Sequence, residues 1–357
     1  RRSTIQSSFN RSAPWIPMIE QVLAAYGLPA DLAYLPVIES GYRTSLTSTA
    51  GAHGMWQFMA PTAREYGLRV DWWVDERADP WKSTRAAAHY LSDLYRIFGD
   101  WPLALAAYNC GPGCVGRALE RENATTFWEL LDKKALPKET RGYVPTFYAT
   151  IALAARPQEF GFTLPNPYDN LPDSVTIHGP VSLDYLASEI GLDADLFRSL
   201  NVELHRGIVP PEPWSLRVPF GTSYLFSDRA WNLEDPSMSI SSHTVTATES
   251  LESFAQRVGA SARELRAMNG LRSDTIAAGE VLWLPVRQTE LAPRLNSRAS
   301  GDGWYVVKPG DTLYSIAKRN GLTVEELAEL NRLGTDRVIH PGDRLTVRIP
   351  PATTGGM

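Results

Sequence analysis

The chain from about Phe9 to Phe160 carries apolar side chains at the three- and four-residue spacing of helices. Residues 15–27 (WIPMIEQVLAAYG) and 80–99 (PWKSTRAAAHYLSDLYRIFG) show this spacing, and both end at a glycine. Residues 101–109 (WPLALAAYN) are too apolar for a surface helix and predict a central one. Residues 143–155 (YVPTFYATIALAA) predict another buried helix. Only short turns separate these runs, so we expect an all-α domain of about 150 residues.

The pattern changes after residues 162–174 (FTLPNPYDNLPDS), whose Pro, Asn and Asp content predicts a linker. Beyond it, short β-like runs flank paired helical runs, and the arrangement repeats. The sequence that begins at His243 recurs from Tyr305 at an offset of 62 residues, and a weaker copy lies 68 residues before it. Internal repeats define an architecture more firmly than single motifs, so we expect three strand–helix–helix–strand units.

Four positions define the repeat. They are Leu183, Leu251 and Leu313; Leu186, Phe254 and Ile316; Gly191, Gly259 and Gly321; and Asn201, Asn269 and Asn331. A polar stretch, residues 287–302, separates the two better-matched copies, which predicts separate modules and not a continuous solenoid.

Composition narrows the functional classes. The chain has 357 residues and a net charge of −5 without a Lys/Arg block, so we expect two or three domains and no nucleic-acid partner. No apolar stretch approaches the length of a membrane span. The chain begins at Arg1 without Met, which suggests a mature or trimmed chain. Cys110 and Cys114 lie four residues apart with no nearby His, so we expect no metal site and leave a disulfide and two free thiols open.

One carboxylate interrupts an apolar run in LPVIESGY, residues 35–42. If a helix begins near Asp31 as its N-cap, Leu32, Leu35 and Glu39 share the inward face, although Pro36 can kink it. The glycine two residues after Glu39 is placed to end the helix. Burial raises the pKa of a carboxyl group, and a protonated carboxyl is what cleavage of a glycosidic bond requires. The alternative is a salt-bridged surface residue.

Three motifs give this carboxylate a context: residues 39–68 (ESGYRTSLTSTAGAHGMWQFMAPTAREYGL), 107–115 (AYNCGPGCV) and 138–145 (KETRGYVP). Together and in this order they resemble the lysozyme-like catalytic domain of the membrane-bound lytic transglycosylases, close to the D type. The resemblance covers residues 12–155, and it implies an all-α lysozyme-like fold.

The resemblance also implies the residues of the site, with Glu39 as the acid and base. It implies substrate-binding or positioning roles for Ser40, Ser48, Gln57, Met59, Tyr108, Asn109, Glu139 and Tyr143. Among these, the Tyr108 hydroxyl is expected close to the acid, and Glu139 and Tyr143 on the far side of the groove. Trp72, Trp73 and Trp81 can stack on sugars, but we favour packing.

The repeats resemble the LysM module, a βααβ carbohydrate-binding domain. The match is strongest for residues 305–349; residues 243–286 lack the first Pro-Gly-Asp, and residues 175–219 lack the Gly-Asp-Thr turn and have PPEPW at the second Pro-Gly. The resemblance implies binding of glycans that contain N-acetylglucosamine, in a groove formed by Gly310, Asp311, Thr312, Leu313, Ile339, His340 and Pro341. The predicted domains are 1–165, 174–220, 241–287 and 303–350.

The implied function is a lytic transglycosylase that cleaves peptidoglycan between N-acetylmuramic acid and N-acetylglucosamine and leaves 1,6-anhydro ends, with no cofactor. A second carboxylate from Glu65, Asp71, Asp75, Glu76 or Asp79 stays open. The alternatives are a hydrolytic muramidase of the same fold and a non-catalytic wall-binding protein. The resemblance places the protein in the bacterial periplasm as a monomer, with a lipid anchor to the outer membrane on residues that would precede Arg1.

Overall fold

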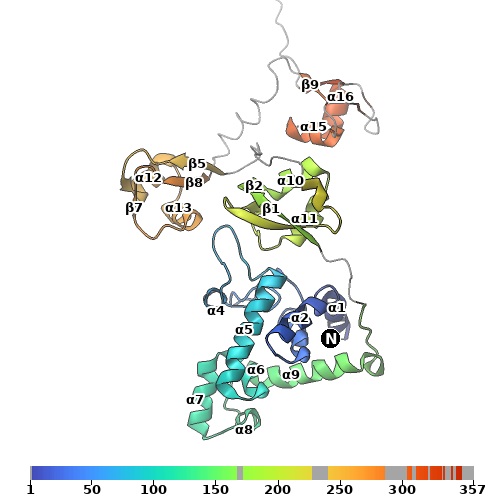
Figure 1. Cartoon of the computed structure of the whole chain (residues 1–357), viewed down its shortest axis with the longest axis vertical. Helices are drawn as coiled ribbons and strands as arrows, with labels where there is room; N and C mark the ends of the chain where they lie inside the picture. The colour runs from blue at the N-terminus through green and yellow to red at the C-terminus, as the bar shows by residue number, and fades with distance from the viewer. Residues whose placement is uncertain are drawn as a thin grey trace, which may run out of the picture. The chain divides into compact units, whose positions relative to one another are not determined.

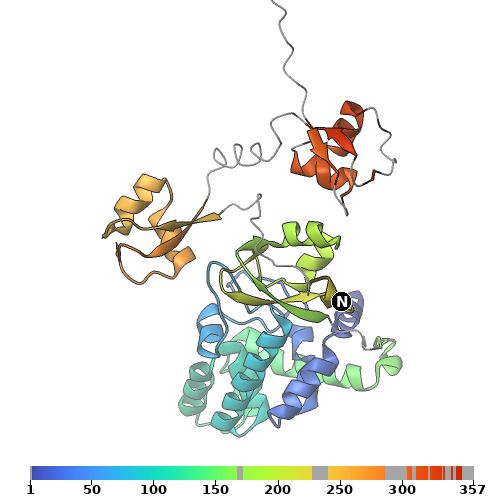
Figure 2. The same cartoon turned by 45° about the horizontal axis from the view of Figure 1, so that its top comes forward.

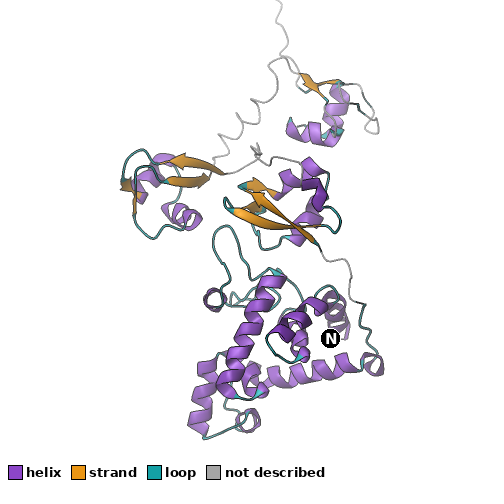
Figure 3. Ribbon diagram, in the orientation of Figure 1, coloured by secondary structure: helices purple, strands orange, loops and turns teal. Residues whose placement is uncertain are grey.

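The computed structural model describes residues 2–166, 172–226, 240–285, 304–307, 311–320, 322–331, 333, 339–340 and 343–347. The chain divides into two compact units, residues 1–179 with 195–229 and residues 180–194 with 230–357. The named elements up to residue 160 are helices joined by loops, and the named strands all follow residue 172 (Figure 3). The linker predicted at 287–302 lies outside the described residues.

The named elements of the N-terminal region of the first unit are all helices, and irregular segments at residues 40–59 and 66–79 join some of them. Its elements are α1 (Arg2–Ser12), α2 (Ile16–Ala25), η1 (Ala30–Tyr34), α3 (Leu35–Glu39), α4 (Ala60–Glu65), α5 (Pro80–Phe98), α6 (Trp101–Cys110), α7 (Pro112–Glu122), α8 (Phe127–Asp132), α9 (Lys138–Ala155) and η2 (Pro157–Phe160). The all-α prediction is therefore confirmed.

The central helix of this domain is α6, as its apolar sequence predicted. It contacts α5, α7, α8 and α9, and the segment from Leu103 to Ala107 is buried. Helices α5 and α6 lie side by side (Figure 1 and Figure 2). The glycines predicted to end α2 and α5, Gly27 and Gly99, both have a left-handed φ, of 68° and 67°. Glycine adopts this conformation without steric cost, which is why the helices stop there.

Three helix predictions need correction. The helical region begins at Arg2 and not near Phe9, because the polar sequence of α1 hides its periodicity. Helix α9 buries only one face, since Tyr143, Val144 and Phe147 are buried whereas the residues between its buried positions reach solvent. The segment around Asp31 is a 3₁₀ turn that leads into α3, and no side chain caps it.

The chain beyond residue 172 forms three units with the predicted element order. The first has β1 (Asp173–His178), β2 (Val181–Ser182), α10 (Leu183–Ile190), α11 (Ala194–Leu200), β3 (Ile208–Val209), β4 (Pro213–Val218) and η3 (Ser223–Phe226). The second has β5 (Ile240–Thr244), β6 (Glu249–Ser250), α12 (Leu251–Val258), α13 (Ala262–Asn269), β7 (Thr275–Ile276) and β8 (Val281–Pro285). The third has β9 (Trp304–Val306), α15 (Leu313–Arg319), α16 (Val324–Leu330) and β10 (Arg344–Thr346).

In each unit the outer strands pair antiparallel: β1 with β4, β5 with β8, and β9 with β10. A serine or threonine caps the first helix each time, through Ser182, Ser250 and Thr312. This cap satisfies an N–H group of the first turn that has no partner within the helix. Among the described residues, no helix is long and apolar enough to span a membrane.

The asparagine of the repeat performs the same task in all three units. The Asn269 amide donates to the carbonyls of Leu265 and Trp283, at 2.9 Å each, and its oxygen accepts the N–H of Trp283 at 2.6 Å. Asn201 bonds Phe197 and Arg217 in the same way, and Asn331 bonds Leu327 and Thr346. The side chain thus ties the last strand of each unit to its second helix.

Replacement of Asn269 by Ala should lower the local stability of the second repeat, β5 to β8, and leave the other two repeats unchanged. It leaves the Trp283 N–H and two carbonyls without this partner, and we expect a loss of about 2 kcal/mol of local stability. Hydrogen exchange of the intact protein should show faster exchange in β5 and β8. Gln256→Ala, at an exposed position of α12, is the control. Equal exchange in both variants would contradict this role.

Candidate active site

Glu39 is the last residue of α3, and two side-chain hydrogen bonds hold the turn that follows it. The Ser40 hydroxyl donates to the Met55 carbonyl at 2.8 Å, and the Arg11 guanidinium donates to the Gly41 carbonyl at 2.6 Å. Gly41 has a φ of 61°, and a Cβ there would lie 2.7 Å from the Ser8 hydroxyl oxygen, so only glycine fits. The contact to Arg11 has no sequence signal, because it joins a side chain to a backbone group 30 residues away.

Glu39 as a whole residue is half-buried, and protein surrounds its carboxyl group. Burial raises the pKa of Glu39 to about 7, and the negative charge of Glu139 acts in the same direction. The Tyr143 hydroxyl donates a hydrogen bond to Glu39 Oε1, and this bond lowers the pKa. The desolvation effect is the largest of the three, so a substantial fraction of Glu39 is protonated at neutral pH.

Helices α6 and α9 bring the other predicted residues to this carboxyl. Burial raises the pKa of Tyr108, and the charge of Glu39 raises it further, so the two side chains lie near each other. The Tyr108 hydroxyl, however, donates to the Trp56 carbonyl at 2.9 Å. The hydrogen bond to the acid therefore comes from Tyr143, which we had expected at the far side of the groove.

Asn109 links α6 to the first turns of α9. Its amide nitrogen is 3.4 Å from Glu139 Oε1, and its oxygen accepts a hydrogen bond from the Thr140 hydroxyl at 2.7 Å. Thr140 is buried and was not among the predicted residues, although it lies within the third motif. Its signal was its spacing of three residues from Tyr143, which puts both side chains on the inward face of α9.

Cys110 and Cys114 form a disulfide, which settles the alternative left open above. Their Cα atoms lie 5.9 Å apart across the corner between α6 and α7. Cys110 directly follows Asn109, so the bond fixes the backbone beside this site residue.

Residues 46–59, here called the 46–59 loop, carry the predicted residues Ser48, Gln57 and Met59. The Ser48 hydroxyl accepts the N–H of Ala52 at 3.0 Å, so in this structure it closes the loop and does not bond the acid. Gln57 has a φ of 50°, and its amide donates to carbonyls of the same loop. The Met59 side chain is exposed, with 43 % of its surface accessible, as a residue that lines a groove would be.

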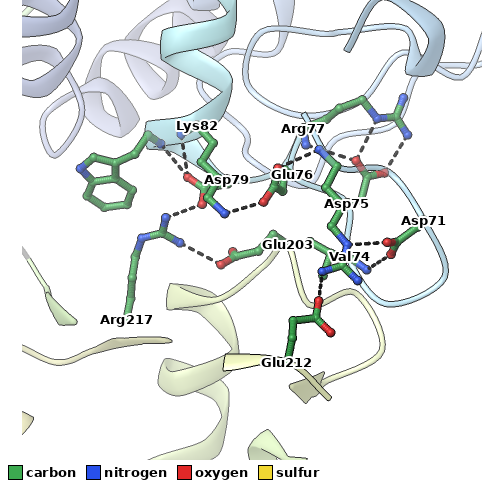
Figure 4. Close-up of polar contacts among 12 residues, drawn as sticks. Asp71, Val74, Asp75, Glu76, Arg77, Asp79, Lys82, Glu203, Glu212 and Arg217 are labelled. Atoms are coloured by element: carbon green, nitrogen blue, oxygen red, sulfur yellow. Dashed lines mark hydrogen bonds and ion pairs between the residues drawn. The ribbon is translucent and has the colours of Figure 1, made fainter. Parts of the chain in front are cut away.

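The alternative carboxylates are mostly engaged elsewhere (Figure 4). Asp71 accepts the N–H groups of Trp73 and Val74, Asp75 pairs with Arg77, Glu76 pairs with Lys82, and Asp79 caps α5 and pairs with Arg217. Glu65 is exposed at the end of α4. In the described part of the chain, no cluster of His, Cys, Asp and Glu could hold a metal ion.

Of the residues predicted to bind glycan in the third repeat, some are exposed to solvent and others belong to the core or the helix cap of the module. Thr312 caps α15, Asp311 accepts a hydrogen bond from Tyr305, and His340 is exposed. The Leu313 side chain lies in the module core, so only its backbone can face a ligand. Ile339 packs against the same core, and Gly310 and Pro341 lie outside the described residues.

Comparison with known proteins agrees with this organisation. Residues 17–131 match the family described as transglycosylase SLT domain, and residues 243–285 and 305–348 match the LysM domain. Residues 172–234 match the family described as the LysM-like domain of lytic transglycosylase MltD.

Curated relatives extend the match. Membrane-bound lytic murein transglycosylase D of Escherichia coli K12 is 29 % identical over 355 residues, which cover 94 % of this chain and 76 % of that protein. The cell wall-binding protein YocH of Bacillus subtilis is 34 % identical over 105 residues, 29 % of this chain and 33 % of its own.

Solved structures show a likeness limited to part of each chain. An inactive mutant of lytic transglycosylase Slt from Pseudomonas aeruginosa aligns with a TM-score of 0.34 and 25 % identity, over 42 % of this chain and 25 % of that one. The soluble lytic transglycosylase Slt70 of Escherichia coli aligns with a TM-score of 0.34 and 23 % identity, over 41 % and 24 %. TM-scores this low do not by themselves define a fold.

These matches give the chain a helical SLT domain, in which α3 ends on Glu39, followed by LysM-type units. Over nearly its whole length, the chain is a homologue of membrane-bound lytic murein transglycosylase D.

Loss of the Tyr143 hydroxyl should raise the pKa of Glu39 further. Tyr143→Phe removes the hydrogen bond that favours the carboxylate. Because a hydrogen bond to a charged group contributes about 1.5 kcal/mol, its loss should raise the pKa of Glu39 by about one unit. Carboxyl-carbon NMR titration of the wild type and the variant measures this directly. A fall in the Glu39 pKa would contradict the assignment.

Replacement of Glu39 by Gln should stabilise the folded protein in a pH-dependent way. The folded-state pKa, about 7, lies above the ordinary value of 4.5, so the wild type loses stability as pH rises between these values. The variant escapes this loss, which reaches at most about 3 kcal/mol above pH 7. Denaturant unfolding at pH 4.5 and pH 8 measures the difference. Glu120→Gln, at an exposed position of α7, keeps Glu39, so its stability should differ from that of the wild type by the same amount at both pH values.

Proposed function

We propose that this protein is a peptidoglycan lytic transglycosylase. It cleaves the β-1,4 bond between N-acetylmuramic acid and N-acetylglucosamine and leaves 1,6-anhydro-muramoyl ends. The observation that carries the proposal is the Glu39 carboxyl, whose burial raises its pKa to about 7, at the end of α3 in an SLT domain. A general acid works best when its pKa lies near the working pH.

The proposed reaction uses Glu39 twice. Its carboxyl proton moves to the bridging oxygen as the bond from C1 of N-acetylmuramic acid to that oxygen breaks, which frees the 4-hydroxyl of N-acetylglucosamine. The 2-acetamido group of the substrate stabilises the developing cation at C1. The Glu39 carboxylate then accepts the proton of the C6 hydroxyl as O6 bonds to C1. Glu39 regains its proton, and no water is consumed.

The remaining side chains have positioning roles in this proposal. Tyr143 orients the Glu39 carboxyl through its hydrogen bond, and Asn109 is held by Thr140 where it can bind the acetamido group. Gln57, Met59 and Ser48 belong to the wall formed by the 46–59 loop. Ser40 and Tyr108 bond backbone carbonyls, which supports a role for them in holding Glu39 and the loop together.

One carboxylate suffices in this reaction, and the structure favours that number. Four of the five alternative acidic residues already pair with basic side chains or cap a helix. The fifth, Glu65, is exposed at the end of α4. Glu139 is a further candidate outside this group, because it is exposed and close enough to affect the pKa of Glu39. A second carboxylate so placed can activate water, so Glu139 favours hydrolysis as the second candidate function.

The proposal extends to the partners and location of the protein. The LysM modules at residues 243–285 and 305–348 bind glycan strands and keep the SLT domain at its substrate. The relative of Escherichia coli is named as membrane-bound, and we extend this to a periplasmic protein at the outer membrane. A lipid anchor and a monomeric state remain part of this proposal.

Mass spectrometry of sacculus digests tests the reaction. The wild type should release fragments with 1,6-anhydro ends, and Glu39→Gln should lower the rate by at least about a thousandfold, because the leaving oxygen then receives no proton. Glu120→Gln should digest sacculi at the wild-type rate. Retained lysis by Glu39→Gln would remove Glu39 from its role.

The same digest separates the second candidate. Reducing ends in place of anhydro ends, lost in Glu139→Gln, would replace transglycosylation by hydrolysis.

A further inference from the structure

The first LysM-like unit contacts the helical domain through a buried charge cluster, all within the first compact unit of the chain (Figure 4). The Arg217 guanidinium binds Asp79 Oδ2 and donates to Glu203 Oε1 at 3.0 Å. Both carboxylate side chains are only 1 % exposed. The guanidinium also lies over the Trp81 ring, at 4.3 Å from its centroid. A charged group that is buried with its partners is strongly destabilising to expose or to leave alone.

One guanidinium faces two carboxyl groups in this cluster. Burial raises the pKa of Glu203 above its ordinary value, although the charge of Arg217 acts in the other direction. Glu203 Oε2 has no hydrogen-bond partner among the described residues. The Glu203 carbonyl accepts the N–H of Asp75 at 2.9 Å, so backbone contacts add to the ion pair.

Residues of a segment that departs from the LysM pattern take part in this interface. Within the divergent PPEPW segment, Glu212 pairs with Arg69, and the Trp214 ring lies under Lys82 at 4.5 Å. Nearby, Arg206 donates to the Trp72 carbonyl at 2.9 Å. The segment that replaces a ligand-binding turn therefore binds the helical domain.

The contacts continue from the interface into the predicted substrate groove. Arg77 is buried and holds Asp75 through two hydrogen bonds, at 2.9 and 2.7 Å. Its remaining nitrogen donates to the Gly51 and Phe58 carbonyls, at 2.9 and 3.0 Å, which lie in the 46–59 loop. Gly54 packs so closely on Arg77 that a Cβ would lie 1.8 Å from the Arg77 carbonyl oxygen. Residues 75–79, which contact the first LysM-like unit, therefore pack directly against the 46–59 loop.

We propose that the first LysM-like unit is a fixed positioning part of the catalytic domain and not a third glycan anchor. Arg217 and Glu203 hold residues 75–79, and Arg77 transmits that placement to the 46–59 loop, which carries Gln57 and Met59. Arg217, Glu203 and Arg77 are positioning residues, because none of them contacts Glu39. The expected change in KM rests on the proposed function. The expected change in hydrogen exchange rests only on the contacts described above.

The test is Arg217→Met in the full chain, with two measurements. Hydrogen exchange should become faster in residues 75–79 and in the 46–59 loop, and stay unchanged in β5 and β8. On soluble glycan strands free of peptide, KM should rise by about tenfold or more with a smaller change in kcat, since substrate-wall residues lose their placement. The pH dependence of kcat should not move, because the surroundings of Glu39 are intact.

Matched variants keep the result interpretable. Arg198→Met, an exposed arginine of α11 in the same unit, should change neither measurement. Arg217→Lys keeps the charge but lacks the planar fork that reaches both carboxylates, so it should give an intermediate effect even if Arg217→Met fails to fold. Arg77→Met should loosen the 46–59 loop while the exchange of residues 203–217 stays unchanged.

Unchanged exchange in the 46–59 loop of folded Arg217→Met would overturn the proposal. A wild type that cleaves no glycan would refute the proposed function alone, because the exchange measurement does not depend on activity.

Discussion

A carboxyl group that protein surrounds on most sides cannot ionise as easily as one in water, and the site depends on this constraint. Glu39 meets it at the end of α3, where the turn is anchored by Ser40, Gly41 and Arg11. Burial raises the pKa of the acid to about 7, and the Tyr143 hydroxyl offsets part of that rise. The central helix α6 and the inward face of α9 supply the surrounding groups. The fold therefore serves to keep one acid poorly hydrated yet reachable.

The same physical rule operates at a second place, where the buried carboxyl groups have a cation as their partner. Asp79 and Glu203 are buried more completely than Glu39, but a guanidinium lies between them. Glu39 accepts a hydrogen bond from the Tyr143 hydroxyl and pairs with no basic side chain among the described residues, so its proton stays available for chemistry. A partner of opposite charge turns a buried carboxyl into a structural link, and its absence from the described surroundings of Glu39 leaves a reactive group.

Much of the fold could be predicted from the sequence, because its signals are local. Helical spacing and the terminal glycines located α2, α5 and α6, and the repeat located three βααβ units with their shared asparagine. Helix α1 was missed in part because its polar residues show no periodicity. The Glu39 contact to Tyr143 spans 104 residues, and the cluster around Arg217 spans 138. Such contacts depend on tertiary packing, and single-sequence patterns do not encode them.

The asparagine of each repeat bonds only the backbone of the residue it holds, which is Arg217, Trp283 or Thr346. The side chain at that position is therefore chemically unconstrained by the bond that fixes its Cα. A duplicated unit can change this one side chain without losing its fold, and so acquire a new neighbour. In the first repeat this side chain is that of Arg217, which forms an ion pair with Asp79. A repeat of a ligand-binding type can in this way come to bind a neighbouring domain of its own chain, through one substitution and a few surrounding contacts.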